Sequence, residues 1–248
     1  MPRAGPCASW LNRRLQTGRL EYLDRDDIDP RKRQVVRSMD WLGRVFRHHE
    51  TFARIAIKEV VDVPDARILE LGAAHGGLSR ALLRMHPTAH ATVTDVEGTS
   101  VAEIAAGDLG DHPRAQVRRQ DATAIDAPDG SYDLAVFAMS FHHLTPALAS
   151  RVFAEGTRVA DKLLIIDVQR LPALLLLVQL ALSLPLSKLV PVVHDAWISN
   201  LRAYSPSALR ALARHADPSI ELQLRGGLNL PVVLPQPQIV VATRRPGL

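Results

Sequence analysis

Short apolar runs alternate with longer amphipathic stretches through the middle of the chain. The runs occupy residues 67–71, 90–95, 116–120, 131–139 and 162–168. The stretches between them include residues 78–85, 99–106 and 146–159. Apolar runs of this length are expected for strands of a parallel sheet whose two faces are covered by helices. Two further runs, 220–224 and 238–243, would complete the sheet, so the predicted fold class is α/β with a Rossmann-like, seven-stranded, mostly parallel sheet.

A leading segment precedes these alternating elements. Between residues 31 and 61 the apolar positions recur every three or four residues, which predicts an amphipathic helix broken near His48-His49-Glu50. Such a helix could lie across a ligand cleft or merely cover the sheet edge, and both alternatives stay open. We therefore expect an N-terminal tail and helical extension over residues 1–63 and the main domain over 64–248.

A leucine-rich insert follows the fifth predicted strand, over residues 169–204. Its segment 171–187 carries no charge but is shorter than the roughly 20 residues of a membrane-spanning helix, and Pro185 interrupts it. It could be a lid over a hydrophobic substrate, a dimer or membrane-surface contact, or a buried helix. We favour the lid, because inserts after strands of such sheets overhang the ligand cleft.

Composition narrows the classes of function. The 248 residues are 47% hydrophobic, enough for a sizeable core, whereas aromatic residues make up only 4% and the net charge is +4. Few rings for base stacking and little excess charge argue against a nucleic-acid partner. Cys7 is the single cysteine, which excludes an internal disulfide and a cysteine-built metal site. The N-terminus lacks the pattern of a secretory signal, so we expect a cytoplasmic protein.

The turn between the first strand and the next helix is rich in glycine, with Gly72, Gly76 and Gly77 following Glu70. Glycine lets a ligand approach the backbone, and the helix that follows presents unpaired N–H groups there. Asp95, at the end of the second strand, lies nineteen positions after Gly76. An acid at about this distance binds ribose hydroxyls in nucleotide-binding α/β units, although it could also be an ordinary turn residue.

The spacing Glu70-x-Gly72-x-x-x-Gly76 resembles motif I of the class I S-adenosylmethionine-dependent methyltransferases. That family has a glycine where this chain has Ala74, a mild departure if the backbone there keeps an ordinary negative φ. Residues 121–122, Asp-Ala, resemble the family's aspartate–alanine element, whose acid and backbone N–H meet the adenine. The resemblance implies S-adenosylmethionine as the cofactor and an antiparallel seventh strand. It assigns cofactor binding to Glu70, Gly72, Ala73, Gly76, Asp95, Val96, Asp121, Ala122 and Ala138.

Methylation of a protonated acceptor atom calls for a general base, most simply a histidine. His142 and His143 follow the fourth strand and are our candidates, with His194-Asp195 as the rival pair. For each histidine a structural role is the competing interpretation. The remaining predicted substrate residues are Arg202 and Tyr204, so the substrate-binding set is His194, Asp195, Arg202 and Tyr204.

Other histidines have weaker assignments. His75 is expected beside the methionine tail of the cofactor, and His49 is expected to be half-buried along the leading helix. Adjacent histidines lack the i,i+4 spacing of a zinc pair on a helix, so no catalytic metal is predicted.

The predicted function is methyl transfer to a hydrophobic small molecule, at oxygen in preference to carbon or nitrogen. Alternatives are a membrane-surface C- or O-methyltransferase of a lipid or quinone, a catalytically silent partner protein with the same fold, and a dinucleotide oxidoreductase. A peripheral membrane contact and a homodimer stay open as modes of association.

Overall fold

The computed structural model describes residues 2–22, 34–35, 41, 43, 47–187, 191–226 and 237–245. The chain divides into two compact units, and each is described by itself. The helical unit comprises Met1–Arg47, Val168–Ala211 and Asn229–Gln236. The sheet unit comprises His48–Asp167, Leu212–Leu228 and Pro237–Leu248. The predicted domain limits, 1–63 and 64–248, stay a prediction.

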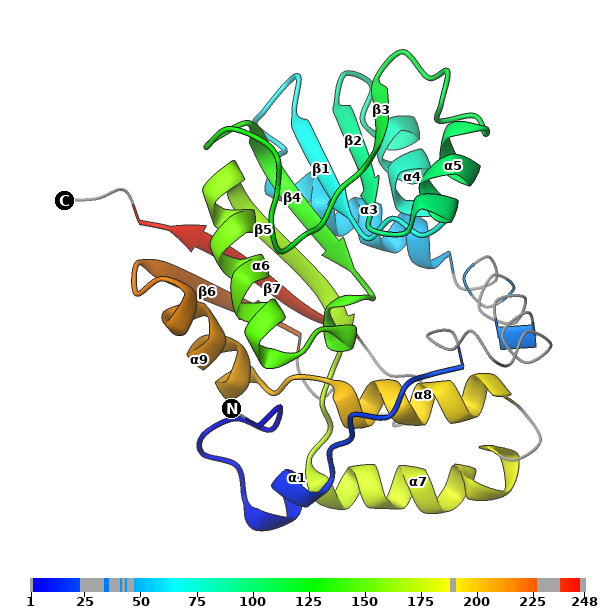
Figure 1. Ribbon diagram of the computed structural model, residues 1–248, viewed down its shortest axis with the longest axis vertical. Coiled ribbons are helices and arrows are strands. Elements are labelled where there is room, and N and C mark those ends of the chain that lie inside the picture. Colours follow the sequence, from blue (N-terminus) through cyan, green and yellow to red (C-terminus); the bar gives the residue numbers. More distant parts are fainter. Residues whose placement is uncertain are drawn as a thin grey trace. The chain divides into compact units, whose positions relative to one another are not determined.

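A seven-stranded sheet forms the centre of the sheet unit (Figure 1). Its strands are β1 (Arg67–Leu71), β2 (His90–Asp95), β3 (Ala115–Arg119), β4 (Tyr132–Ala138), β5 (Ala160–Val168), β6 (Ile220–Arg225) and β7 (Pro237–Arg244). They lie in the order β3-β2-β1-β4-β5-β7-β6, with β6 and β7 antiparallel and β1 to β5 parallel. The predicted fold class is confirmed, including the last strand inserted between β5 and β6.

One face of the sheet is covered by α3 (His48–Glu59) and α4 (Gly77–Met85). Phe52 and Leu82 on these helices share a buried cluster with Ile68, Leu134 and Leu164 on three neighbouring strands. Apolar residues on the helices thus meet alternate residues of the strands. α3 packs on the face of the central strands, so the alternative in which the leading segment covers only the sheet edge is wrong for this helix. Most of the predicted helix before residue 47 lies outside the described residues.

The opposite face carries α6 (Pro146–Val159), which Figure 1 shows in front of the sheet. Thr145 caps its N-terminus, and Pro146 occupies the first turn, where a missing N–H costs nothing. Gly156 lets the helix approach closely, because a Cβ there would lie 2.8 Å from the Leu163 side chain of β5. α5 (Gly98–Ala105) follows β2, and α9 (Pro206–Ala216) runs from the helical unit into the sheet unit.

The helical unit contains α1 (Trp10–Arg14), α7 (Ala173–Ser187) and α8 (Pro191–Arg202). Arg170 joins its parts: the guanidinium is buried and donates to the carbonyls of Asn12, Leu15, Leu201 and Ala203. Burial lowers the pKa of Arg170 to about 10. In the described part of the chain, no helix combines the length and the apolar character that crossing a membrane requires.

Candidate active site

The carboxyl ends of β1 and β4 lie side by side at the middle of the sheet. From β1 the chain builds outward through β2 and β3, and from β4 it builds in the other direction through β5. Ligands of open α/β sheets bind at such a switch point, beyond the carboxyl ends of the strands. Most of the predicted cofactor residues and the two predicted bases belong to turns at this edge.

The glycine turn after β1 uses left-handed backbone at three positions. Gly72 and Gly76 have φ values of 66° and 72°, as glycine allows. Ala74 has φ 50°, so the expectation of an ordinary negative φ at this position is wrong. An alanine in this region costs about 1–2 kcal/mol because its Cβ approaches the following carbonyl oxygen. The loss of the family's middle glycine is therefore a backbone effect, which a sequence comparison alone does not show.

Asp95, at the end of β2, holds this turn in place. Its Oδ2 accepts a hydrogen bond from the N–H of Ala74 at 2.8 Å, and its Oδ1 accepts one from the N–H of Glu97 at 2.9 Å. A carboxylate has about four lone-pair sites, so each oxygen keeps a further site for a ribose hydroxyl. Asp95 is thus both a brace for the strained Ala74 and an acceptor suited to vicinal hydroxyls.

Glu70 points into the protein, toward the start of α4. Its Oε2 accepts from the backbone N–H of Ser79 at 3.1 Å and from the Ser79 hydroxyl. Burial raises the pKa of Glu70 to about 7, against the opposing effect of the two Ser79 hydrogen bonds. The carboxylate therefore binds the N-terminal turn of α4, where a negative charge is favourable, and this contact orients the helix behind the glycine turn.

The other predicted cofactor residues follow the neighbouring strands. Asp121 is exposed beyond β3, and its Oδ1 accepts from the N–H and the hydroxyl of Thr123, both at 2.8 Å. Ala122 is next to it, half-buried. Val96 directly follows Asp95 and is 50% exposed, although it is an apolar side chain beside polar turns. An exposed valine next to Asp95, the predicted ribose-binding residue, is suited to covering one face of an adenine.

A residue that sequence reasoning missed lies at the end of β4, after Ala138. Met139 has φ 55°, and its side chain is 37% exposed. Its N–H donates to the carbonyl of Ile166 on β5 at 2.7 Å, which fixes the unusual backbone. Strained φ values tend to cluster at functional sites, and here they occur after both central strands, at Ala74 and Met139. No sequence signal marks Met139, because nothing about methionine favours a positive φ.

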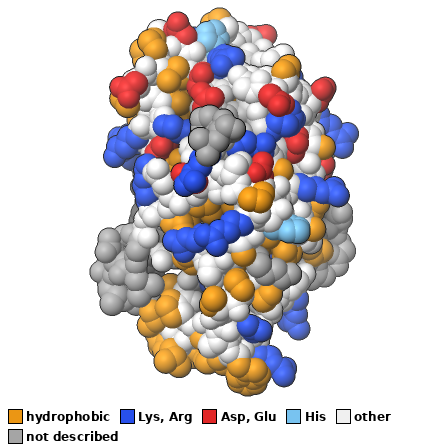
Figure 2. Space-filling view, turned by 90° about the vertical axis from the view of Figure 1, so that its left-hand side faces the viewer, with side chains coloured by type: hydrophobic (Ala, Val, Ile, Leu, Met, Phe, Trp, Pro, Cys, Tyr) orange, Lys and Arg blue, Asp and Glu red, His pale blue; other side chains and the backbone are white. Residues whose placement is uncertain are grey.

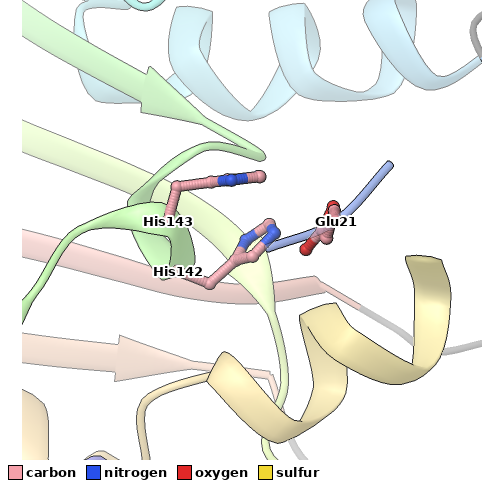
Figure 3. A group of neighbouring side chains, drawn as sticks. All are labelled: Glu21, His142 and His143. Carbon is pink, nitrogen blue, oxygen red and sulfur yellow. The ribbon is translucent and has the colours of Figure 1, made fainter. Parts of the chain in front are cut away.

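His142 forms a buried pair with Asp167. The short helix η1 (Phe141–His143) follows β4, and Figure 3 shows the two histidine side chains projecting from it. The Nδ1 of His142 lies 2.6 Å from Oδ1 of Asp167, and His142 is only 2% exposed. A carboxylate on Nδ1 favours the tautomer that carries its proton there and leaves Nε2 as the basic nitrogen. Phe141 anchors η1 by edge contacts with Phe137 and Phe153.

The other histidines of the sheet unit differ in environment. The ring of His143 lies 4.3 Å from that of His142 and is half-buried. His75 is largely exposed, with Nδ1 3.8 Å from the carboxylate of Glu103. His49 is exposed, so the expectation of a half-buried side chain is wrong. Its ring nevertheless packs against the start of α4, because a Cβ on Gly77 would lie 2.6 Å from it.

The rival pair, His194-Asp195, belongs to α8 in the helical unit. Asp195 is buried, and its Oδ1 lies 3.1 Å from Nδ1 of His194. The same oxygen accepts from the backbone N–H of Tyr22 at 2.9 Å, and the Tyr22 ring lies 4.4 Å from that of His194. The buried Glu21 beside it accepts from the hydroxyl of Ser199. These contacts attach the N-terminal segment to α8, so the pair has a structural task of its own.

Arg202 and Tyr204, the other predicted substrate residues, are also buried in the helical unit. The carbonyl of Arg202 accepts from the guanidinium of Arg3, which also lies 4.7 Å above the Tyr204 ring. Their place in substrate binding stays a prediction, as does the expectation of no metal.

The sequence of this chain resembles that of known methyltransferases over its central part. Residues 68–162 match the family model described as a methyltransferase domain. A malonyl-[acyl-carrier protein] O-methyltransferase of Geobacter sulfurreducens is 36% identical over 97 residues, which cover 39% of this chain and 35% of that protein. The chain thus matches about a third of the length of this curated relative.

Solved structures extend the similarity beyond the matched segment. The plantazolicin methyltransferase BpumL in complex with SAH aligns with a TM-score of 0.64 at 11% identity, over 89% of this chain and 92% of that one. The same enzyme with a monoazolic desmethylPZN analog and SAH aligns with a TM-score of 0.60 at 12% identity, over 88% and 91%. At such identities the likeness concerns the fold, which these proteins share with the present chain.

Proposed function

We propose that the protein transfers a methyl group from S-adenosylmethionine to a hydrophobic small molecule, at an oxygen atom. The match of residues 68–162 to the family model described as a methyltransferase domain supports this reaction. One observation carries the proposal: the glycine turn, Asp95 and the Asp121 turn follow β1, β2 and β3 at one edge of the sheet. These strands are neighbours, so three polar turns come together where a nucleoside ligand of this fold would bind.

The residues at this edge fit the proposed cofactor. Asp95 would accept from the two ribose hydroxyls, Val96 would cover one face of the adenine, and Asp121 with Ala122 would bind its edge. The backbone of the glycine turn, from Gly72 to Gly76, would lie along the methionine portion. When bound, S-adenosylmethionine supplies a methyl group on a positively charged sulfur, ready for displacement.

His142 is the base we assign to the acceptor. With its Nδ1 bonded to Asp167, the Nε2 nitrogen would take the proton of the acceptor hydroxyl as the new oxygen–carbon bond forms. Alignment of the two reacting atoms and exclusion of water would supply the rest of the rate enhancement. The buried position of His142 supports a role in a dry pocket.

The names of similar proteins support the class of reaction. The Geobacter relative is an O-methyltransferase, and BpumL has been solved with a small-molecule analog and SAH.

Two experiments test the proposal in sequence. Isothermal titration with S-adenosylhomocysteine should give saturable binding, and Asp95→Ala should weaken it by about 1–3 kcal/mol. Because Asp95 also braces Ala74, thermal melting must show that this variant is folded. No binding by a folded wild-type protein would refute the proposed cofactor. Incubation with labelled cofactor and cell extract, followed by mass analysis, should then identify the methylated product.

A further inference from the structure

Large apolar side chains are exposed mainly on the helical unit. Of the eleven that are exposed in the described part of the chain, seven belong to this unit. They are Trp10, Leu20, Trp41, Leu174, Leu177, Val178 and Leu182. Exposed apolar residues scattered singly are ordinary, but a concentration in one unit indicates an interaction surface.

Four of these residues form one face of α7, here called the α7 face: Leu174, Leu177, Val178 and Leu182. Leu174 and Leu182 are 72% and 75% exposed, whereas Leu176 and Ala173 on the other side are buried. Positions 174, 178 and 182 are four apart, so they lie along one side of the helix. An exposed helix face normally carries charged residues, and this helix has none.

The N-terminal segment of the same unit adds a tryptophan and arginines. Trp10 is 70% exposed, and the guanidinium of Arg14 lies 5.5 Å from the centre of its ring. Residues 1–20 contain four arginines and no acid. Arg170 lies three residues before α7 begins, and its guanidinium donates to the carbonyls of Asn12 and Leu15. These hydrogen bonds hold α1 near the start of α7. Figure 2 shows apolar and basic side chains side by side at the lower end of the view, over α1.

We propose that the helical unit binds the surface of an anionic phospholipid bilayer through the α7 face, with Trp10, Arg14 and Arg19 at the level of the headgroups. An apolar helix face enters the boundary between headgroups and acyl chains when it lies in the plane of the membrane. Tryptophan is enriched at that depth, and arginines without neighbouring acids attract anionic lipid. α7 lies on the bilayer without crossing it, which its 15 residues require.

The arginines decide between a bilayer and a second copy of the chain. Two copies joined through the α7 face would bring together two segments of the same positive sign, which is unfavourable. An anionic surface removes this repulsion and provides partners for the guanidinium groups. The inference is independent of the proposed methyl transfer, because it uses no residue of the sheet unit.

Flotation with lipid vesicles tests the inference on the full chain. Vesicles of phosphatidylcholine with about one third phosphatidylglycerol should carry the protein upward, and pure phosphatidylcholine should carry much less. Leu174→Asp with Leu182→Asp should weaken binding by about 10-fold or more. Arg14→Gln with Arg19→Gln should weaken it by about 25-fold, since each arginine contributes about 5-fold. Arg13 is left in place because it donates to the carbonyls of Pro6 and Ala8.

Val61→Asp is the matched control. Val61 is 69% exposed and belongs to the sheet unit, so this change adds a negative charge at an exposed apolar position outside the α7 face and should leave vesicle binding unchanged. Thermal melting and titration with S-adenosylhomocysteine report on folding of each variant. Absence of flotation with anionic vesicles, or flotation that survives the double leucine change, would overturn the inference. A dimer in sedimentation velocity that this change dissociates, without vesicle binding, would assign the α7 face to self-association.

Discussion

Each unit contains a close histidine–carboxylate pair, and the two pairs differ in how they are built. His142 and Asp167 are 25 residues apart and meet across β4 and β5 at 2.6 Å, with His142 almost fully buried. His194 and Asp195 are neighbours on α8 at 3.1 Å, and the His194 side chain is 30% exposed. Oδ1 of Asp195 also accepts a hydrogen bond from the backbone N–H of Tyr22 at 2.9 Å, which ties the second pair to the N-terminal segment.

If His142–Asp167 is the catalytic pair, as we propose, adjacency in sequence is a poor guide to such a pair. The carboxylate of Asp195 binds the backbone of Tyr22, so a change at Asp195 disturbs the N-terminal segment. The carboxylate of Asp167 is brought to His142 by the parallel register of β4 and β5, in which Ala138 lies opposite Ile166. We therefore favour His142–Asp167 as the pair that acts on the acceptor, and the following experiments are chosen to separate the two.

Removal of the two imidazoles should give the largest contrast. His142→Ala should lower kcat by about 100- to 10 000-fold, the usual loss of a general base, and leave S-adenosylhomocysteine binding unchanged. His194→Ala should change kcat by less than about 10-fold. Initial rates on the acceptor identified by label transfer measure both variants, with thermal melting as the folding control. The reverse ranking would assign the base to the helical unit.

The pH dependence of stability must be separated from that of activity before either histidine is assigned. Burial raises the pKa of Glu70 from its ordinary 4.5 to about 7, so the folded protein binds more protons than the unfolded chain between these pH values. The contribution of Glu70 to the free energy of unfolding should therefore be largest below pH 4.5 and should fall as the pH rises. Above pH 7 the whole contribution, about 3 kcal/mol, should be lost.

Urea unfolding at pH 5 and pH 8, without cofactor, measures this effect. Glu70→Gln keeps an acceptor for Ser79 and should remove most of the difference between the two pH values. If the variant retains the full difference, another group is responsible. A pH–rate profile recorded in the Glu70→Gln background then reports on the histidines with less interference from folding.

Neutralising each carboxylate should produce effects of different kinds. Asp167→Asn should lower kcat by about 10- to 100-fold, because the partner of Nδ1 no longer favours the required tautomer. Asp195→Asn should instead lower the free energy of unfolding by about 1–3 kcal/mol, through the weakened bond to Tyr22. Parallel measurements of kcat and urea unfolding distinguish them. A loss of stability without loss of kcat in Asp167→Asn would make that pair structural as well.

The smallest effect is expected at the glycine turn after β1. Ala74→Gly relieves a left-handed alanine but adds freedom to the unfolded chain, for a net stabilisation of about 0.5–1 kcal/mol. Neither histidine is changed, so the kcat ratio of the His142→Ala and His194→Ala variants should stay as it was. Thermal unfolding checks the sign. Destabilisation would mean that Ala74 is not held at a positive φ in solution.

Much of the fold could be predicted because its signals are local. Buried strands such as 67–71 are apolar, and the glycines mark the turn after β1. Thr145 and Pro146 are residue types that favour the N-cap and the first position of a helix. The spacing of Asp95 and Asp121 could likewise be predicted, since each follows a strand directly. These features depend on residue type and periodicity, which the order of residues contains.

Other features depend on parts of the chain that are distant in sequence. The positive φ of Ala74 is held by the carboxylate of Asp95, and that of Met139 by the carbonyl of Ile166. The turn of Glu70 toward Ser79 depends on how α4 packs behind β1. The exposure of Leu174 and Leu182, which separates a surface helix from a buried one, depends on which side of α7 meets its neighbours.

The amino-acid order alone thus accounts for the strands, the glycine turn and the acids that follow it, because hydrophobic period and backbone preference act over a few residues. The pairing of His142 with Asp167, the strain at Ala74 and the outward face of α7 arise only when the chain is folded. Each requires two segments far apart in sequence to be brought within contact distance, and short-range preferences contain no information about that distance.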